Sequence, residues 1–118
     1  MKLEELQVYQ LAMALADEVH TIVVQWDNFY KFSTGIQLLK AVDSIAANIS
    51  EGFGRFHFKD HKNFLYFSRG SLFETKTWLT KAHRRKLIED ENFNQLIKAS
   101  DVLGVKLNNY IRSIGPST

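Results

Sequence analysis

The sequence contains no cysteine and a single proline, Pro116, among its 118 residues. Without cysteine the chain has no disulfide, thiolate nucleophile or cysteine-ligated metal. This absence suits a reducing compartment. The first residues lack the basic segment and apolar block of a signal peptide, and no apolar run approaches the ~18 residues of a membrane span. We therefore expect a cytoplasmic protein without a membrane segment.

The sequence signatures of catalysis are also missing, including the Walker loop, GxSxG and HExxH. A di-iron site in a helical bundle needs Glu-x-x-His on two helices, and no glutamate here has histidine three residues later. His57 and His61 could share a metal on a helix, but no third ligand is evident. We expect no enzyme, cofactor or metal. The enzymatic alternative would be a site built from Glu51, Glu74 and a histidine.

Positive charge is concentrated in the middle of the chain. Residues 1–51 have three Lys or Arg against seven Asp or Glu, and residues 89–118 have three against four. Residues 52–88 have nine against two, a balance of +7 in a chain whose net charge is +2. This excess suits an anionic partner, although a solvated helix face would carry the same charges.

Apolar residues recur at helical spacing almost throughout, and no strand-like alternation persists. The spacing predicts four amphipathic helices over residues 3–24, 34–52, 60–86 and 90–114. Four such helices with short links can bury their apolar stripes together as a bundle. We expect an all-α, antiparallel, up-down-up-down four-helix bundle that forms one domain, 1–118. Gly52 and Gly54 are expected to end the second helix by adopting positive φ.

The third helix is expected to bury one stripe and to expose another. The predicted core stripe consists of Phe64, Leu65, Phe67, Ser68, Ser71, Leu72, Trp78, Leu79 and Ala82. Glu74 lies at the edge of this stripe, and if partly buried it needs a partner such as Arg55. A second line is predicted on the opposite side of the helix, at Lys62, Tyr66, Arg69, Phe73, Lys76, Thr80 and His83.

This second line alternates cations with aromatic side chains, which suits stacked bases and phosphates and equally suits a protein interface. Gly70, on the flank of the same helix, suggests the close approach of another backbone. The nucleic-acid-binding candidates are Arg55, Lys59, Lys62, Arg69, Lys76, Arg84, Arg85 and Lys86. Tyr66 and Phe73 are candidates either for base stacking or for a subunit contact.

A polar stripe follows the second helix and points toward Arg55. It contains Gln37, Lys40, Ser44, Asn48 and Glu51. Short amides and hydroxyls favour ordered hydrogen bonds over mere solubility. The stripe predicts either a polar network within one subunit or a subunit interface. The full set of candidates for these two roles is Gln37, Lys40, Ser44, Asn48, Glu51, Tyr66, Gly70, Ser71, Phe73 and Glu74.

Three stretches of the sequence resemble the four-helix-bundle family encoded by intervening sequences in bacterial 23S ribosomal RNA genes. They are Leu6-Gln7-Val8-Tyr9-Gln10-Leu11-Ala12, residues 37–55, and Ser68-Arg69-Gly70-Ser71-Leu72-Phe73-Glu74. The specific part is Asn-Ile-x-Glu-Gly-x-Gly-Arg followed by Gly-Ser-Leu-x-Glu. The chain departs from the family at Ala46, where proline is usual, at Leu39, where a second basic residue is common, and at Asp43, which replaces an apolar residue.

The resemblance implies an up-down bundle that assembles as a homopentamer and has no established enzymatic activity. A related group, the accessory proteins of diversity-generating retroelements, is similar in fold and binds a reverse transcriptase and nucleic acid through a basic surface. From the resemblance and the charge pattern together, we expect a self-associating scaffold that binds RNA or an RNA-processing partner. The alternative is a purely structural oligomer or protein adaptor that binds no nucleic acid.

Overall fold

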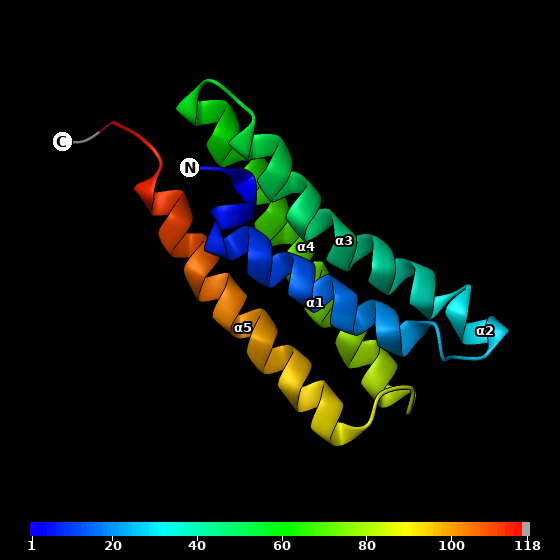
Figure 1. Cartoon of the computed structure of the whole chain (residues 1–118). Coiled ribbons are helices and arrows are strands. Elements are labelled where there is room, and N and C mark those ends of the chain that lie inside the picture. Colours follow the sequence, from blue (N-terminus) through cyan, green and yellow to red (C-terminus); the bar gives the residue numbers. More distant parts are fainter. Residues whose placement is uncertain (117–118) are drawn as a thin grey trace.

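Four long helices run antiparallel to their neighbours (Figure 1). The computed structural model describes residues 1–116. The long helices are α1 (Gln7–Val23), α3 (Thr34–Phe53), α4 (Phe58–Arg84) and α5 (Asp90–Ser113), with a 3-10 turn η1 (Leu3–Glu5) before α1 and a short helix α2 (Asn28–Lys31) before α3. Residues 1–116 contain no strand. The predicted all-α class and antiparallel four-helix bundle are confirmed.

The four long helices form a square in cross-section. Helix α1 packs against α3 and α5, and α4 packs against the same two helices, so α1 and α4 occupy opposite corners. Figure 1 shows α1 in front of α4, with α3 and α5 on either side. The bundle measures 51 × 23 × 21 Å. Because each helix is antiparallel to the next, the short α3–α4 turn and α2 lie at opposite ends of this rod.

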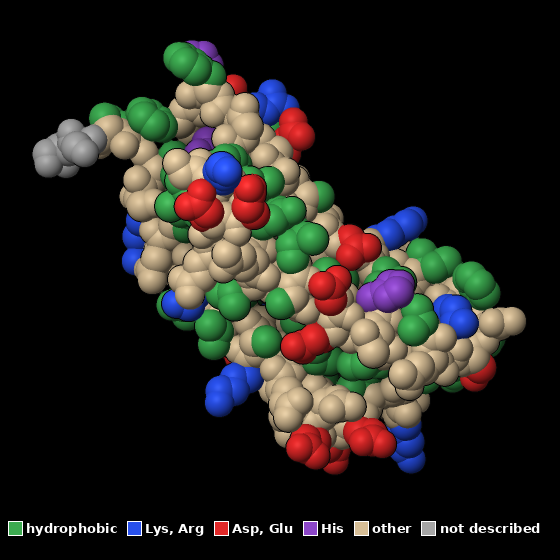
Figure 2. Space-filling view, in the orientation of Figure 1, with side chains coloured by type: hydrophobic (Ala, Val, Ile, Leu, Met, Phe, Trp, Pro, Cys, Tyr) green, Lys and Arg blue, Asp and Glu red, His purple; other side chains and the backbone are tan. Residues whose placement is uncertain are grey.

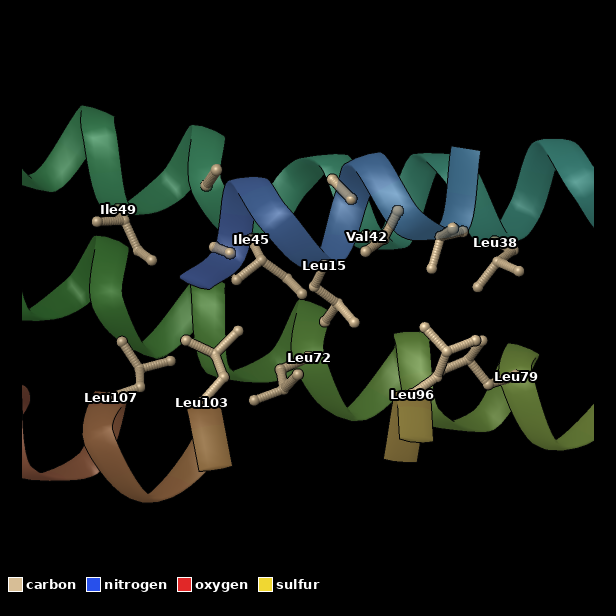
Figure 3. Packing of buried hydrophobic residues seen from close by; sticks show 14 of the residues in the cluster. Leu15, Leu38, Val42, Ile45, Ile49, Leu72, Leu79, Leu96, Leu103 and Leu107 are labelled. Carbon is tan, nitrogen blue, oxygen red and sulfur yellow. The ribbon is translucent and has the colours of Figure 1, made fainter. Parts of the chain in front are cut away.

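The core runs along the axis of the bundle, where apolar side chains of all four long helices meet (Figure 3). Leu38, Ile45 and Ile49 of α3 face Leu79 of α4 and Leu107 of α5, and all five are fully buried. This is the stripe that the helical spacing predicts, because residues three and four apart share one face of a helix.

The helix boundaries differ from the predicted ones in three places. The helix predicted over 3–24 is interrupted, because Leu6 is extended (φ −76°, ψ 119°) between η1 and α1. Helix α4 begins at Phe58 and ends at Arg84, and Lys86 takes a left-handed φ of 62° in the turn that follows. Helix α2 was not predicted; the carboxylate of Asp27 caps it by accepting a hydrogen bond from the Tyr30 amide at 3.2 Å.

The prediction that Gly52 and Gly54 adopt positive φ is wrong. Gly54 has φ −79°, and Gly52 lies inside α3 and is buried. A Cβ at Gly52 would lie 3.0 Å from both the carbonyl oxygen of His61 and the Cβ of Phe64. The Asn-Ile-x-Glu-Gly-x-Gly-Arg motif therefore needs glycine at position 52 because α4 passes close to α3, and not because the backbone turns there.

Two predicted core positions of α4 are also corrected. Phe67 is 59% exposed, because it lies about 100° around the helix from its buried neighbour Ser68, beyond the stripe that faces α3 and α5. Glu74 is exposed rather than at the edge of the core. Its carboxylate accepts a hydrogen bond from the Trp78 indole at 3.4 Å, and Arg55 bonds to Glu51 instead. Both side chains therefore belong to the outer surface of α4.

Candidate functional site

The polar stripe of α3 lies beside α4 and is partly used within the protomer. The hydroxyl of Ser44 bonds to that of Ser71 on α4, and the Asn48 amide donates to the Ser44 carbonyl oxygen at 2.8 Å. Glu51 and Arg55 form an ion pair of 2.7 Å, and both remain exposed. The intrasubunit network thus joins the middle of α3 to α4. Gln37 and Lys40 lie exposed on the same stripe.

Three members of the predicted cation and aromatic line of α4, Arg69, Lys76 and His83, lie beside α5 and not opposite the core. Each of them reaches a side chain of α5. The pairs are Arg69–Asn108 (3.1 Å), Lys76–Asp101 (2.6 Å) and His83–Asp90 (2.6 Å). Because these partners satisfy them, Arg69 and Lys76 are less available to an anionic partner than the sequence suggests.

A cleft of about 310 Å³ lies between α4 and α5, next to the Arg69–Asn108 and Lys76–Asp101 pairs. Leu72 and Gly104 contribute to its lining, and Arg69 and Lys76 stand beside it with their α5 partners. Over residues 1–116, no group of three or more His, Asp or Glu side chains could hold a metal ion.

The outward face of α4 carries three exposed aromatic side chains around a glycine. Tyr66, Phe67 and Phe73 are exposed, and they lie one helical turn or less from Gly70. Within residues 1–116, no atom comes within 4 Å of the position that a Gly70 Cβ would take, apart from the local helix backbone. We call these four residues the α4 aromatic face. Such a cluster is typical of a contact with another molecule.

The cations of α4 and its flanking turns fall into two groups at the two ends of the helix. One group contains Arg55, Lys59 and Lys62. The other contains Lys81, Arg84, Arg85 and Lys86, of which Lys81 was not predicted. In the described part of the chain, the basic side chains that form ion pairs are Arg55, Lys76 and His83. The Arg85 guanidinium donates to the Thr34 hydroxyl at 2.8 Å. The sequence-predicted basic surface is therefore two patches separated by paired residues.

The two histidines considered as a metal-binding pair, His57 and His61, have different surroundings. His57 is exposed, whereas His61 is partly buried beside the Tyr110 ring, with its Nε2 3.3 Å from the Tyr110 hydroxyl. Burial lowers the pKa of His61 below its ordinary value of 6.5 and raises that of Tyr110 above 10.0. The pair joins the start of α4 to the end of α5, which is a structural role.

The sequence over residues 4–109 matches the model of the 23S rRNA-intervening sequence protein family. The chain belongs to that family. This confirms the resemblance carried by residues 6–12, 37–55 and 68–74. No curated protein matches the chain.

The fold of this family member is similar to a crystal structure from Bacteroides thetaiotaomicron VPI-5482, described as a protein with unknown function from the S23 ribosomal protein family. The TM-score is 0.83 at 22% identity, over 90% of this chain and 99% of that one. The likeness concerns the fold.

No helix within residues 1–116 is both long enough and apolar enough to cross a membrane.

Sequence analysis missed two exposed aromatic residues of the α3–α4 turn. Phe56 is 93% exposed and Phe58 is 54% exposed. Both phenylalanines alternate with polar residues in Arg-Phe-His-Phe-Lys, a pattern that belongs to no helical apolar stripe because it lies where one helix ends and the next begins.

Proposed function

We propose that this member of the 23S rRNA-intervening sequence protein family is a non-enzymatic, cytoplasmic scaffold that assembles with copies of itself and binds RNA. The α4 aromatic face is the proposed subunit contact. The two cationic groups at the ends of α4 are the proposed RNA contacts. The single observation that supports this most is the outer surface of α4 and its flanking turns. It combines exposed aromatic side chains with these two groups of cations, which, apart from Arg55, lack carboxylate partners among residues 1–116.

Self-association accounts for the α4 aromatic face better than solvent exposure does. Aromatic side chains are enriched in protein interfaces, and a glycine on a helix surface lets a second backbone come close. Gly70 costs α4 about 1 kcal/mol relative to alanine, and no neighbour within the protomer requires it. The family resemblance implies five copies, so the proposed assembly is a homopentamer.

RNA binding is supported by the charge of the surface that self-association would leave uncovered. Lys59, Lys62, Arg84 and Lys86 lie toward the ends of α4, away from Gly70 at its middle. Each subunit would therefore present cations beyond the subunit contact, and repetition in an assembly would add to the affinity for a long polyanion. The alternative, a purely structural oligomer, uses the same subunit contact but gives these cations no partner.

One measurement addresses both parts of the proposal. The mass of the purified protein in solution is determined by sedimentation, with and without nuclease treatment, together with the absorbance ratio that reports nucleic acid. We expect a mass of several subunits that survives nuclease, and nucleic acid that co-purifies and is then removed. A multimer free of nucleic acid that does not bind RNA at low salt would support the structural alternative. A monomer in both samples would contradict self-association.

The substitution Gly70→Leu tests the subunit contact. An added Cβ at Gly70 meets open space within the protomer, and leucine is a better helix former than glycine by somewhat less than about 1 kcal/mol. We therefore expect a protein at least as stable as the wild type whose assembly is lost or strongly weakened. Asn94→Leu, at an exposed position of α5, is the matched control. An unchanged sedimentation profile for Gly70→Leu would remove the α4 aromatic face from the interface.

A further inference from the structure

Two phenylalanines, one in the turn between α3 and α4 and the other at the first residue of α4, lie in solvent at one end of the bundle. Phe56 is 93% exposed and Phe58 is 54% exposed, although Phe53, only three residues earlier, packs against the core. In Figure 2, apolar and histidine side chains protrude at this end of the molecule. We call residues 55–59 the α3–α4 tip. Its phenylalanines do not serve the core of the protomer.

The α3–α4 tip is also cationic. Arg55 and Lys59 bracket the two phenylalanines, and Lys62 follows on the first turns of α4, against the single carboxylate of Asp60 in residues 55–62. Arg55 is held in place, because it pairs with Glu51 at 2.7 Å and its guanidinium lies over the Phe64 ring at 4.6 Å. Lys59 and Lys62 have no carboxylate within ion-pair distance in residues 1–116, so they can meet an anion without losing an existing pair.

We propose that the α3–α4 tip binds single-stranded RNA by stacking unpaired bases on Phe56 and Phe58, while Lys59 and Lys62 contact the neighbouring phosphates. This deepens the RNA-binding function proposed above and rests on it. Flat aromatic rings interleaved with cations fit a strand whose bases and phosphates alternate. A duplex does not fit, because its bases already stack on each other and its grooves present no free base faces.

The opposite end of the bundle provides an internal comparison. Phe29 (72% exposed) and Phe32 (65% exposed) of the α2 segment are also in solvent, but Asp27 and Lys31 give that segment no excess of positive charge. Aromatic exposure alone would make both ends equivalent. Charge complementarity favours the α3–α4 tip for an anionic strand, and the α2 phenylalanines become the matched control.

The test compares three probes with the full chain at low salt: oligoadenylate, an abasic ribose-phosphate strand of the same length, and an RNA duplex. The abasic strand keeps the phosphates and removes the stacking partners. We expect wild type to bind oligoadenylate about tenfold more tightly than the abasic strand. Phe56→Ala combined with Phe58→Ala should remove that preference and leave the affinity for the abasic strand unchanged. Phe29→Ala combined with Phe32→Ala should keep the preference.

Each contrary result has a separate meaning. Equal, salt-sensitive binding of all three probes by wild type would overturn stacking at the tip but leave the proposed RNA-binding function intact. No binding of any probe by wild type would remove both. Loss of the assembly in the Phe56 and Phe58 variant would make the tip a subunit contact instead. Capture of wild type by anionic phosphatidylserine vesicles, without a preference among the strands, would make it a membrane contact.

Discussion

Ser68 shows how a single polar residue can serve a helical core. It is fully buried in α4, and its hydroxyl donates to the carbonyl oxygen of Ile45 on α3 at 2.8 Å. A buried hydroxyl without a partner would destabilise the fold, so the hydrogen bond is what makes serine tolerable here. The sequence placed Ser68 correctly in the core stripe, because helical spacing depends on position and not on side-chain chemistry. It did not identify the partner.

Also at the residue scale, the burial of His61 predicts how the free energy of unfolding depends on pH. Burial lowers its pKa in the folded state, so the unfolded chain binds a proton more readily. The free energy of unfolding should therefore fall as the pH drops through 6.5, the ordinary pKa of this histidine, and should level off once the folded state is also protonated. Urea unfolding of wild type and His61→Gln across this range measures the effect.

The comparison isolates one histidine, because His20, His57 and His83 are present in both proteins. We expect the stability of His61→Gln to depend less on pH than that of wild type in the acidic range. Tyr110 remains protonated there, since its pKa is raised above 10.0, so it adds no titration of its own. Identical pH profiles for the two proteins would contradict the inference.

At the scale of elements, α3 and α4 approach each other closely at Gly52. Alanine there would bring its Cβ to 3.0 Å from the His61 carbonyl oxygen. Overpacking costs about 1–3 kcal/mol, which outweighs the gain of up to about 1 kcal/mol from replacing a helical glycine. We expect Gly52→Ala to lower the free energy of unfolding by about 1 kcal/mol in chemical denaturation.

The second glycine of the same motif provides the control. At Gly54 an added Cβ meets nothing closer than 3.7 Å, and φ is −79°, which any residue adopts. Gly54→Ala should therefore be as stable as wild type. Equal losses for the two variants would mean that the motif acts through backbone flexibility rather than through helix contact.

The elements themselves differ in how well the sequence specified them. Each long helix has an apolar stripe over many residues, so α3 and α5 were predicted within a residue or two at each end. Helix α2 has only four residues, which is too short for a periodic signal. Asp27 caps its start, and the indole of Trp26, just before the cap, donates to the Leu87 carbonyl oxygen. That last contact spans 61 positions and leaves no local trace in the sequence.

At the scale of the whole molecule, the topology places the acidic and basic parts of the sequence on different sides of the surface. The acidic first part of the chain includes α1, and the basic middle part includes α4. Since α1 and α4 occupy opposite corners of the square, the charges separate across the bundle. The face seen in Figure 2, which α1 occupies, carries acidic side chains along its length. An anion would therefore be steered toward α4.

This charge arrangement predicts how the affinity for RNA depends on salt concentration. If RNA is bound through cations of α4, affinity should fall with added salt, and removing each contacting lysine should reduce the log–log slope by about 0.7 for a single strand. Lys59→Ala and Lys62→Ala test this by fluorescence anisotropy titrations at several salt concentrations. Lys98→Ala, on the α1 side of α5, should leave the slope unchanged. A slope unaffected by either α4 lysine would exclude them as phosphate contacts.

The sequence by itself determined the four long helices, the bundle and the concentration of positive charge in residues 52–88, because periodicity, length and composition act locally along the chain. The tertiary structure decided which side chains remain outside. Packing pairs Arg69 and Lys76 with α5 and leaves Phe67 and Phe56 in solvent. Exposure and pairing depend on which helices become neighbours, and that is a property of the assembled bundle.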